Sequence, residues 1–268
     1  MDLLWFTIIW VIVSLLGEWG LHALEHLGLY YYTASAQAIA GEKAVAFILT
    51  VLVPVISFVI VLLVYNAIRF RSRSNKPILS RHQFRDNKLF IGSWVILSIA
   101  LNILFFVHPS ASAVEQMFNS EEARFNRNDL VVNVTARQWE WIFSYPQYGI
   151  QYAQDTNGNS TLYLPVNRNV RFVLRSYDPY HTYAPYIGVI HDFWVPAFGL
   201  KQDIIPGETR YEYVHTNKIT SYDVDPMVRV QCAEVCGPGH PYMEAPVHVV
   251  SQTDFAKWIQ VQKKLQQS

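Results

Sequence analysis

VAFILTVLVPVISFVIVLLVY, residues 45–65, is a stretch of twenty-one residues without a charged side chain. As an α-helix it is about 31 Å long, which is enough to cross the hydrocarbon core of a bilayer. Pro54 lies inside it, and a proline is tolerated in a membrane helix because neighbouring helices can satisfy the freed carbonyl. The stretch therefore predicts a membrane-spanning helix with a kink near Pro54.

A second uncharged stretch, LFIGSWVILSIALNILFFVH at residues 89–108, is also of spanning length, and Pro109 marks its expected end. The loop between the two stretches is basic. It contains a single acidic residue, Asp86. Its basic residues are Arg69, Arg71, Arg73, Lys76, Arg81, Arg85 and Lys88. Positive loops stay in the cytoplasm, so the pattern predicts a helical hairpin and places all residues after Pro109 outside the cytoplasm.

The N-terminal residues 3–16 are strongly apolar but form only a short run before Gly17 and Glu18. A signal peptide is one interpretation, but Asp2 stands where basic residues are usual and the nearest small-residue cleavage motif, residues 34–36, lies far downstream. A re-entrant or interfacial helix is another. We expect a third membrane span that starts in the cytoplasm.

Four polar residues, Glu18, His22, Glu25 and His26, follow at helical spacings. Carboxylates and imidazoles on one helix face can bind a metal ion. Polar side chains are also usual where a helix end meets the membrane interface. We expect an interfacial helix end here, and not a metal site.

Composition agrees with a chain that lies partly in lipid. Hydrophobic residues make up 51% of the chain and charged residues 16%, against about 25% charged in soluble domains. The formal net charge is zero. No overall field therefore favours a nucleic-acid or polyanion partner.

Beyond residue 109 no run is long enough to span a bilayer, and β-branched and aromatic residues alternate with polar ones. Strands are expected at residues 131–143, 161–165, 170–176, 189–196, 209–215 and 227–231. Turns are expected at Asn157-Gly158, Asp178-Pro179 and Pro206-Gly207. The pattern predicts an antiparallel sandwich or barrel.

Three parts follow from these patterns. Residues 1–43 form the N-terminal apolar segment and an outer loop, and residues 44–109 form the transmembrane hairpin with its cytoplasmic loop. Residues 110–268 form an all-β domain that ends in a helix at 255–267, capped by Thr253-Asp254. The predicted fold class is a membrane α-helical anchor joined to an extracytoplasmic all-β domain.

Metal-binding side chains concentrate in one segment, QCAEVCGPGHPYM at residues 231–243. Two thiols, an imidazole and a thioether select copper, and zinc sites rarely use methionine. A blue-copper site needs one cysteine, so the second cysteine indicates a centre with two bridging thiolates. A disulfide between Cys232 and Cys236 is the alternative, but three intervening residues make such a bond strained.

This segment resembles the dinuclear copper A motif of cytochrome c oxidase subunit II. Cys232, Glu234, Cys236, His240 and Met243 match the motif, and the segment VIHDFWVPAFGLKQDIIPG at 189–207 resembles the family's stretch that holds a further histidine, here His191. The resemblance covers about residues 44–258. It implies a cupredoxin-like Greek-key fold for the outer domain.

The resemblance also implies roles for these residues. Cys232 and Cys236 would bridge two copper ions, and His191 and His240 would each bind one of them. Met243 and the backbone carbonyl of Glu234 would be weak axial ligands. The Glu234 carboxylate would help bind magnesium at the boundary with the catalytic subunit, although a loop-stabilising hydrogen bond is the plainer interpretation of that side chain.

The segment QWEW at residues 138–141 resembles the family's aromatic segment where electrons enter from the donor. Trp139 matches the tryptophan at which they enter, and Trp141 follows two residues later. Without the copper motif, both would be read as core or edge aromatics of one strand. Beside it, we expect them to accept electrons.

The function that the resemblance implies is that of the electron-accepting subunit of a respiratory haem-copper terminal oxidase. The chain would take electrons from cytochrome c or a blue-copper protein and pass them to haem in the catalytic subunit I. No haem is expected on this chain, because a Cys-x-x-Cys-His motif is absent. The alternative is a membrane-anchored copper-binding or copper-delivery protein; a quinol oxidase subunit, which lacks the copper ligands, and a nitrous oxide reductase-type domain are disfavoured.

Three departures from the family pattern bear on the partners. Gly188 stands where an acidic residue is frequent, and Glu140 where an aromatic is common. The surface that docks the donor is therefore expected to differ from one suited to a basic cytochrome c. Residues 90–94 hold no glutamate, and Asp86 is read as a loop charge, so proton uptake through this chain is not expected.

Overall fold

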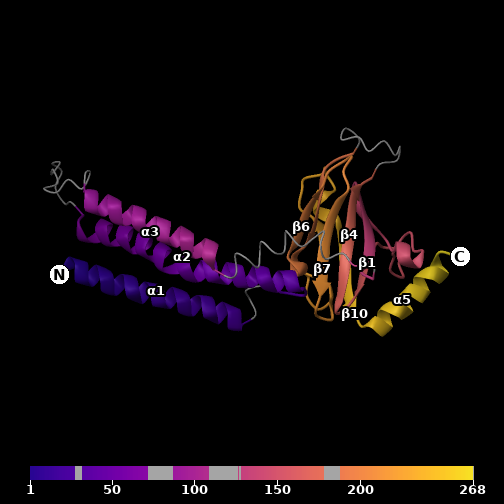
Figure 1. Cartoon of the computed structure of the whole chain (residues 1–268), viewed down its shortest axis with the longest axis horizontal. Coiled ribbons are helices and arrows are strands. Elements are labelled where there is room, and N and C mark those ends of the chain that lie inside the picture. The colour runs from indigo at the N-terminus through magenta and orange to yellow at the C-terminus, as the bar shows by residue number, and fades with distance from the viewer. Residues whose placement is uncertain (28–31, 72–86, 109–125, 127, 178–187, 268) are drawn as a thin grey trace. The chain divides into compact units, whose positions relative to one another are not determined.

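A computed structural model describes residues 1–27, 32–71, 87–108, 126, 128–177 and 188–267. The chain divides into two compact units, one made of long helices and one made of strands (Figure 1). The predicted turn at Asp178-Pro179, the loop charges between residues 72 and 86, and the predicted boundary at residue 110 lie outside the described residues.

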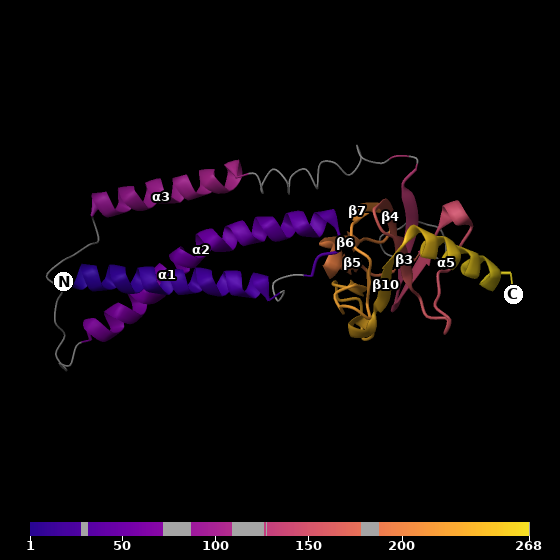
Figure 2. The ribbon, with the colours of Figure 1, turned by 90° about the horizontal axis from the view of Figure 1, so that it is seen from below.

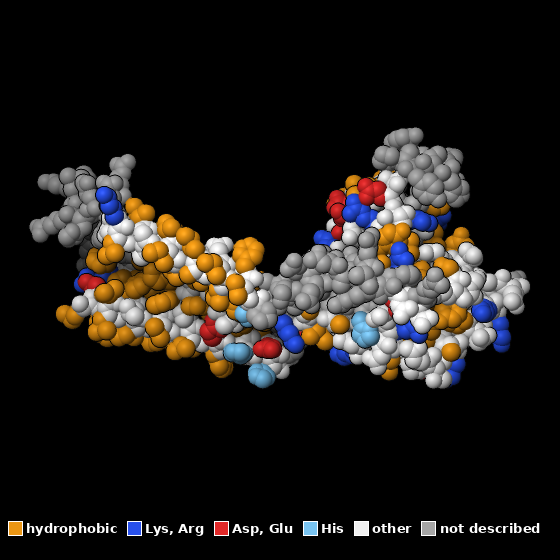
Figure 3. Space-filling view, in the orientation of Figure 1, with side chains coloured by type: hydrophobic (Ala, Val, Ile, Leu, Met, Phe, Trp, Pro, Cys, Tyr) orange, Lys and Arg blue, Asp and Glu red, His pale blue; other side chains and the backbone are white. Residues whose placement is uncertain are grey.

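Three helices are long and apolar enough to cross a membrane: α1 (Asp2–His26), α2 (Ala36–Arg69) and α3 (Lys88–Val107). Hydrophobic side chains cover the face of these helices seen in Figure 3. Helix α2 contains Pro54 and starts nine residues before the predicted span. The N-terminal stretch is one continuous helix of 25 residues, which confirms a third segment of spanning length.

Helix α1 packs against α2 in the antiparallel direction. At the start of α1, Asp2 Oδ1 lies 2.9 Å from Arg69 Nε, near the end of α2. Further along, the Trp10 indole N–H donates to the Pro54 carbonyl at 2.8 Å. A polar contact at one end and an indole hydrogen bond in the middle therefore set the register of the two helices.

The strand unit holds two sheets, one of four strands and one of six, which lie beside the C-terminal helix in Figures 1 and 2. The first sheet contains β2 (Glu140–Ser144), β1 (Leu130–Arg137), β4 (Arg168–Ser176) and β7 (Arg210–Thr216). The second contains β3 (Leu162–Pro165), β10 (Glu244–Val250), β9 (Arg229–Cys232), β5 (His191–Val195) and β6 (Leu200–Ile204), with β8 (Thr220–Ser221) paired to β10. The predicted fold class, apolar helices followed by an all-β domain, is confirmed.

The core of the strand unit lies between the inward faces of the strands. Along β1, buried residues alternate with more exposed ones, as expected for a strand with one face on the core. The largest fully buried side chains are Trp141, Tyr145, Phe143, Phe172, Phe193 and Phe198. Burial of such rings contributes about 1.5–3 kcal/mol each.

Two details of the strand prediction are wrong. The sheets are not purely antiparallel, because β1 pairs with β4, and β10 with β3, in parallel. The predicted strand at residues 131–143 is a hairpin of β1 and β2 that turns at Gln138 and Trp139. The alternation of apolar residues indicates which face is buried but not which neighbour a strand pairs with or where it turns.

The C-terminal helix α5 (Gln252–Leu265) has a different cap from the predicted one. Ser251 is the N-cap, and its hydroxyl accepts a hydrogen bond from the Asp254 backbone N–H at 3.1 Å. Phe255, Ile259 and Gln262 are the residues that α5 buries. The Trp258 ring stacks on Tyr163 of β3, with ring centroids 4.8 Å apart.

Residues before α2 form part of the strand unit. The Ala34 N–H donates to the Ala197 carbonyl at 2.7 Å, and the Ser35 hydroxyl donates to the Phe198 carbonyl at 2.7 Å. The same Ser35 oxygen accepts a hydrogen bond from the Ala38 backbone N–H at 2.9 Å and so caps α2. One buried serine therefore joins the helix start to short helix η3 (Pro196–Phe198), which directly follows β5.

Candidate metal centre

Strand pairing brings the two metal-binding segments together. Strand β5 begins at His191, and β9 ends at Cys232. The two strands are antiparallel neighbours in which Phe193 pairs with Cys232. His191 therefore lies beside the start of the cysteine loop, although the two residues are far apart in sequence.

The loop after β9 returns the remaining predicted ligands to the same place. The Cys232 N–H donates to the Met243 carbonyl at 3.1 Å, and the His240 N–H donates to the Gly237 carbonyl at 3.0 Å. Gly237 has a φ of 119°, a region that disfavours side chains. Hydrogen bonds between backbone groups of the chain thus close this loop.

Each cysteine lies beside a different imidazole. Cys232 Sγ is 3.8 Å from His191 Nδ1, and Cys236 Sγ is 3.7 Å from His240 Nδ1. The two Sγ atoms are 3.8 Å apart, and Met243 Sδ is 3.9 Å from Cys236 Sγ. The structure therefore brings together the four side chains that the sequence predicts as principal ligands, with Met243 on one side.

Glu234 contributes its backbone to this cluster. Its carbonyl oxygen lies 3.2 Å from Cys232 Sγ, while its side chain is exposed. The carbonyl therefore lies next to one of the two thiols, and its role as an axial ligand stays a prediction. The carboxylate is free to face a partner, which is compatible with the predicted magnesium role.

Burial favours the neutral forms of two of these groups, His191 and Cys236. Burial, with His240 nearby, lowers the pKa of His191 to about 4. Burial and the neighbouring Cys232 thiol raise the pKa of Cys236 to about 12. At neutral pH the His191 imidazole is therefore neutral and can bind a metal ion directly. The Cys236 thiol is protonated, and a metal ion that binds it must displace the thiol proton.

The donor set fits soft metal ions. His191, Cys232 and Cys236 place one ligand atom each within 4.8 Å of one another, and all three are buried. Among the described residues this is the one group of three such ligands. His22 and Glu25 of α1 lie 3.5 Å from each other and are exposed.

Trp139 lies at the surface against the copper loop. Its side chain is 41% exposed, and its indole N–H donates to the Cys236 carbonyl at 3.2 Å. A side chain that reaches both solvent and a ligand residue suits the predicted role in accepting electrons. Glu140, which stands where an aromatic residue is common in the family, forms an ion pair with Arg137 at 2.5 Å.

Trp141 lies in the core, where it is 1% exposed. Its ring centroid is 6.4 Å from that of His191, and its indole N–H donates to the Met243 carbonyl at 3.2 Å. Trp141 therefore packs against the predicted metal ligands His191 and Met243 on the core side and does not reach the surface. Of the two tryptophans, Trp139 is the one with an exposed side chain.

The sequence did not point to two residues that surround the ligands. Gln138 donates its amide N–H to the Cys236 carbonyl at 2.7 Å. Asp192 is 3% exposed, and its Oδ1 has no hydrogen-bond partner among the described residues. Gln138 lies in the segment 138–141 and Asp192 in the segment 189–207, both of which resemble the family, but neither residue belongs to the ligand pattern. Their contacts with the ligand residues form only when the strands pack together.

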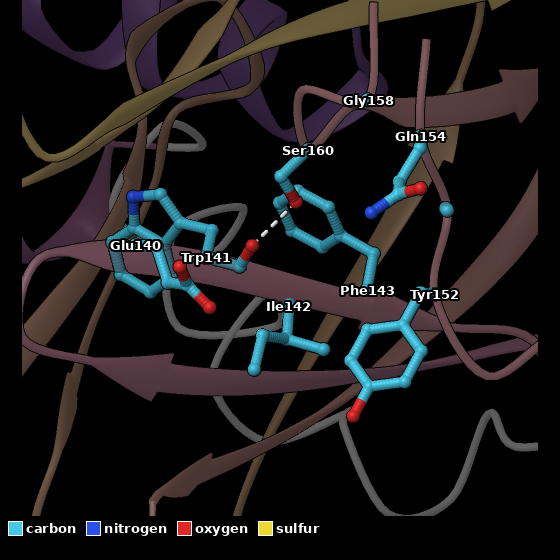
Figure 4. Close-up of a pocket in the computed structure, with 9 residues that line it drawn as sticks. Glu140, Trp141, Ile142, Phe143, Tyr152, Gln154, Gly158 and Ser160 are labelled. Carbon is cyan, nitrogen blue, oxygen red and sulfur yellow. Dashed lines mark hydrogen bonds between the residues drawn. The ribbon is translucent and has the colours of Figure 1, made fainter.

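A small pocket lies away from the metal ligands, along β2 and the following loop (Figure 4). The Ser160 hydroxyl donates to the Trp141 carbonyl across it. None of the predicted copper ligands lines this pocket, so it is not part of the candidate centre.

The family model described as "Cytochrome C oxidase subunit II, periplasmic domain" matches residues 130–251. This range includes all six predicted copper ligands. Residues 130–251 form a domain of the cytochrome c oxidase subunit II family. The resemblance drawn from the copper motif is thereby confirmed.

Relatives of this subunit II domain extend the match toward the N-terminus. The probable cytochrome c oxidase subunit 2 of Rickettsia bellii is 28% identical over 234 residues, which cover 82% of this chain and 78% of the relative. The cytochrome c oxidase subunit 2 of Alkalihalophilus pseudofirmus is 25% identical over 91% of this chain, which spans 63% of that relative.

Among solved structures, the periplasmic domain of subunit II of cytochrome oxidase from Bradyrhizobium japonicum is similar, with 28% identity and a TM-score of 0.43. The similarity covers 52% of this chain and 96% of that domain.

Proposed function

We propose that this chain is the electron-accepting subunit of a respiratory haem-copper terminal oxidase. It takes single electrons from a soluble donor, cytochrome c or a blue-copper protein, at a dinuclear copper A centre. It passes them to haem in the catalytic subunit I, where oxygen is reduced to water. The observation that carries this proposal is the pairing of two thiols 3.8 Å apart with one imidazole each.

The ligand arrangement suits two metal ions better than one. The sulfur atoms of Cys232 and Cys236 are close enough for both to bind the same two metal ions. His191 and His240, in contrast, each lie beside a different thiol. Two copper ions bridged by these thiolates would, when bound, share one electron, so the geometry would change little on transfer. Soft thiolate and thioether ligands favour copper over zinc.

The protein residues hold the centre and exclude water from it. His191 is 1% exposed, and Cys232, Cys236 and Met243 are buried. The backbone hydrogen bond between Cys232 and Met243 closes the loop around them. A closed loop supports electron transfer over copper delivery, because delivery sites exchange their metal.

The family and the charge pattern support the proposed membrane part and the proposed partners. The three apolar helices anchor the chain in the cell or inner membrane, and the basic loop after Arg69 puts the copper domain on the extracytoplasmic, periplasmic side. The exposed Glu234 carboxylate binds magnesium together with the catalytic subunit. Other oxidase subunits and lipid complete the set of partners.

The test uses the full chain, purified in detergent and loaded with copper. Copper analysis and electron paramagnetic resonance compare the unmodified chain with Cys232→Ser and Met243→Leu. Met227→Leu is the matched control, because Met227 is an exposed methionine outside the centre.

Two copper ions per chain and a spectrum split by two equivalent copper nuclei are expected, with the splitting lost in Cys232→Ser and altered in Met243→Leu. The control variant is expected to match the unmodified chain. A single-nucleus spectrum, or copper that a chelator removes at once, would contradict the proposal and favour copper handling.

A further inference from the structure

The carbonyl oxygen of Cys236 is held by two donors from one short turn. The Gln138 side-chain amide donates at 2.7 Å, and the Trp139 indole N–H donates at 3.2 Å. A carbonyl oxygen has two lone pairs and can accept both hydrogen bonds. The two donors are consecutive residues in the turn between β1 and β2.

The copper loop is shaped to receive the indole. A Cβ atom built on Gly239 would lie 2.3 Å from Trp139 Cδ2, which is closer than any real contact. A Cβ on Gly237 would lie 3.1 Å from the same indole and 3.2 Å from Gln138 Nε2. Because Gly237 and Gly239 have no side chain, the Trp139 ring can lie directly against the backbone of the loop.

We propose that the Cys236 carbonyl is the junction between Trp139 and the copper centre, and that Gln138 is the positioning residue that fixes this junction. The inference rests on the proposed function. An electron from the reduced donor crosses the N–H···O=C hydrogen bond and the covalent bonds of Cys236 to its Sγ. The donor is oxidised by one electron and the copper pair reduced by one, and no bond forms or breaks.

Gln138 is assigned the positioning role because its hydrogen bond is the shorter of the two. At 2.7 Å it is at the strong end for an N–H donor, whereas the indole bond at 3.2 Å is at the long end. The amide thus fixes where the carbonyl points, and the indole follows. The positive end of the amide dipole also favours the reduced centre, as groups around metal ligands commonly do.

The experiment measures the assembled oxidase containing the full chain. Gln138→Leu removes the donor at nearly constant volume. Gln138→Asn is the second variant, because its amide is one methylene too short to reach the carbonyl, and it is used if the leucine variant loses copper. Gln147→Leu is the matched control, because Gln147 Nε2 also donates to a backbone carbonyl, that of Asp129, at 2.7 Å.

Two quantities are compared: the reduction potential of the copper centre and the single-turnover rate of electron uptake from the donor. In the Gln138 variants we expect the potential to shift lower and the uptake rate to fall about tenfold, the factor that corresponds to loss of one positioning hydrogen bond. Trp139→Phe, which keeps a ring but lacks the indole N–H, is expected to slow uptake while the Gln138 bond remains.

Equal potentials and equal uptake rates in the Gln138 variants and Gln147→Leu would overturn this inference. It would leave the proposed function standing if the unmodified chain still shows two coupled copper ions. Absence of that copper signal in the unmodified chain is instead a failure of the proposed function itself.

Discussion

Cys232 Sγ and Cys236 Sγ lie 3.8 Å apart, each beside a different imidazole. The pair is symmetric in its sulfur atoms but not in its surroundings. His191 starts a buried strand, whereas His240 lies in short helix η4 (His240–Tyr242) and is only half-buried. Free imidazole from solution should therefore substitute for the His240 side chain more readily than for the His191 side chain.

Imidazole rescue tests this difference. His191→Gly and His240→Gly are each expected to weaken copper binding by at least about 100-fold, since even residues behind a ligand change affinity by 10- to 100-fold. Added imidazole should restore the two-nucleus copper spectrum in His240→Gly, because that site opens to solvent. It should not restore the spectrum in His191→Gly. Equal rescue of both variants would show that the burial of His191 does not close its site.

The second prediction concerns Asp192. Burial raises its pKa to about 6, with Lys201 opposing and Asp203 and Glu234 adding to the rise. A raised carboxyl pKa stabilises the fold below about pH 4, and that stabilisation is lost as the pH rises to about 6. Above this pH, Asp192→Asn should therefore stabilise the copper-free chain by up to about 3 kcal/mol, from 1.36 kcal/mol per unit.

Urea unfolding followed by tryptophan fluorescence measures the effect of Asp192→Asn at pH 7.5 and at pH 4. The gain should be present at the higher pH and nearly absent at the lower one. Asp223→Asn, at an exposed aspartate, is the control and should change little. A gain of the same size at both pH values would mean that the charge of Asp192 is not its source.

The membrane helices were predictable because their signal is long. An uncharged apolar run of about twenty residues is typical of a membrane span and rare in soluble domains. Helix α2 contains the first predicted stretch, and α3 contains the second except for its last residue, His108. The start of α2 was not predictable. It depends on Ser35, which is buried against Phe198 of the strand unit and caps the helix from there.

Strands were predictable where apolar alternation is clear and not where it is weak. Strand β10 contains Pro246, which argues against a strand in sequence alone. Strand β6, LKQDI, holds three polar residues in succession. Both form because neighbouring strands supply their hydrogen-bond partners, which no local pattern reveals.

The metal ligands were predictable because five of them lie within twelve residues of one another, in a pattern that itself indicates copper. The residues around them were not. Gln138 precedes Cys236 by 98 positions, and only the packing of the β1–β2 turn on the copper loop joins them. The core position of Trp141 likewise follows from burial and not from its spacing to Trp139.

Ser35 gives the third prediction. Ser35→Ala removes the cap of α2 and the donor to the Phe198 carbonyl, in a fully buried position. We expect a loss of about 1–3 kcal/mol in the stability of the strand unit. Thermal unfolding of the full chain measures it. Ser93→Ala, which removes an exposed hydroxyl that donates to its own helix, is the control; a loss no larger than in that control would contradict the structural role of Ser35.

The packing of α1 on α2 predicts the side of the membrane on which the chain starts. Asp2 contacts Arg69, the last residue of α2 and the first cation of the basic loop. Because such loops are cytoplasmic, a tag placed before Met1 should be cytoplasmic too. In sealed right-side-out vesicles, an added protease should leave that tag intact and remove one placed after Gln267, which serves as the internal control. Removal of both tags would place the start of α1 outside and would contradict its antiparallel packing on α2.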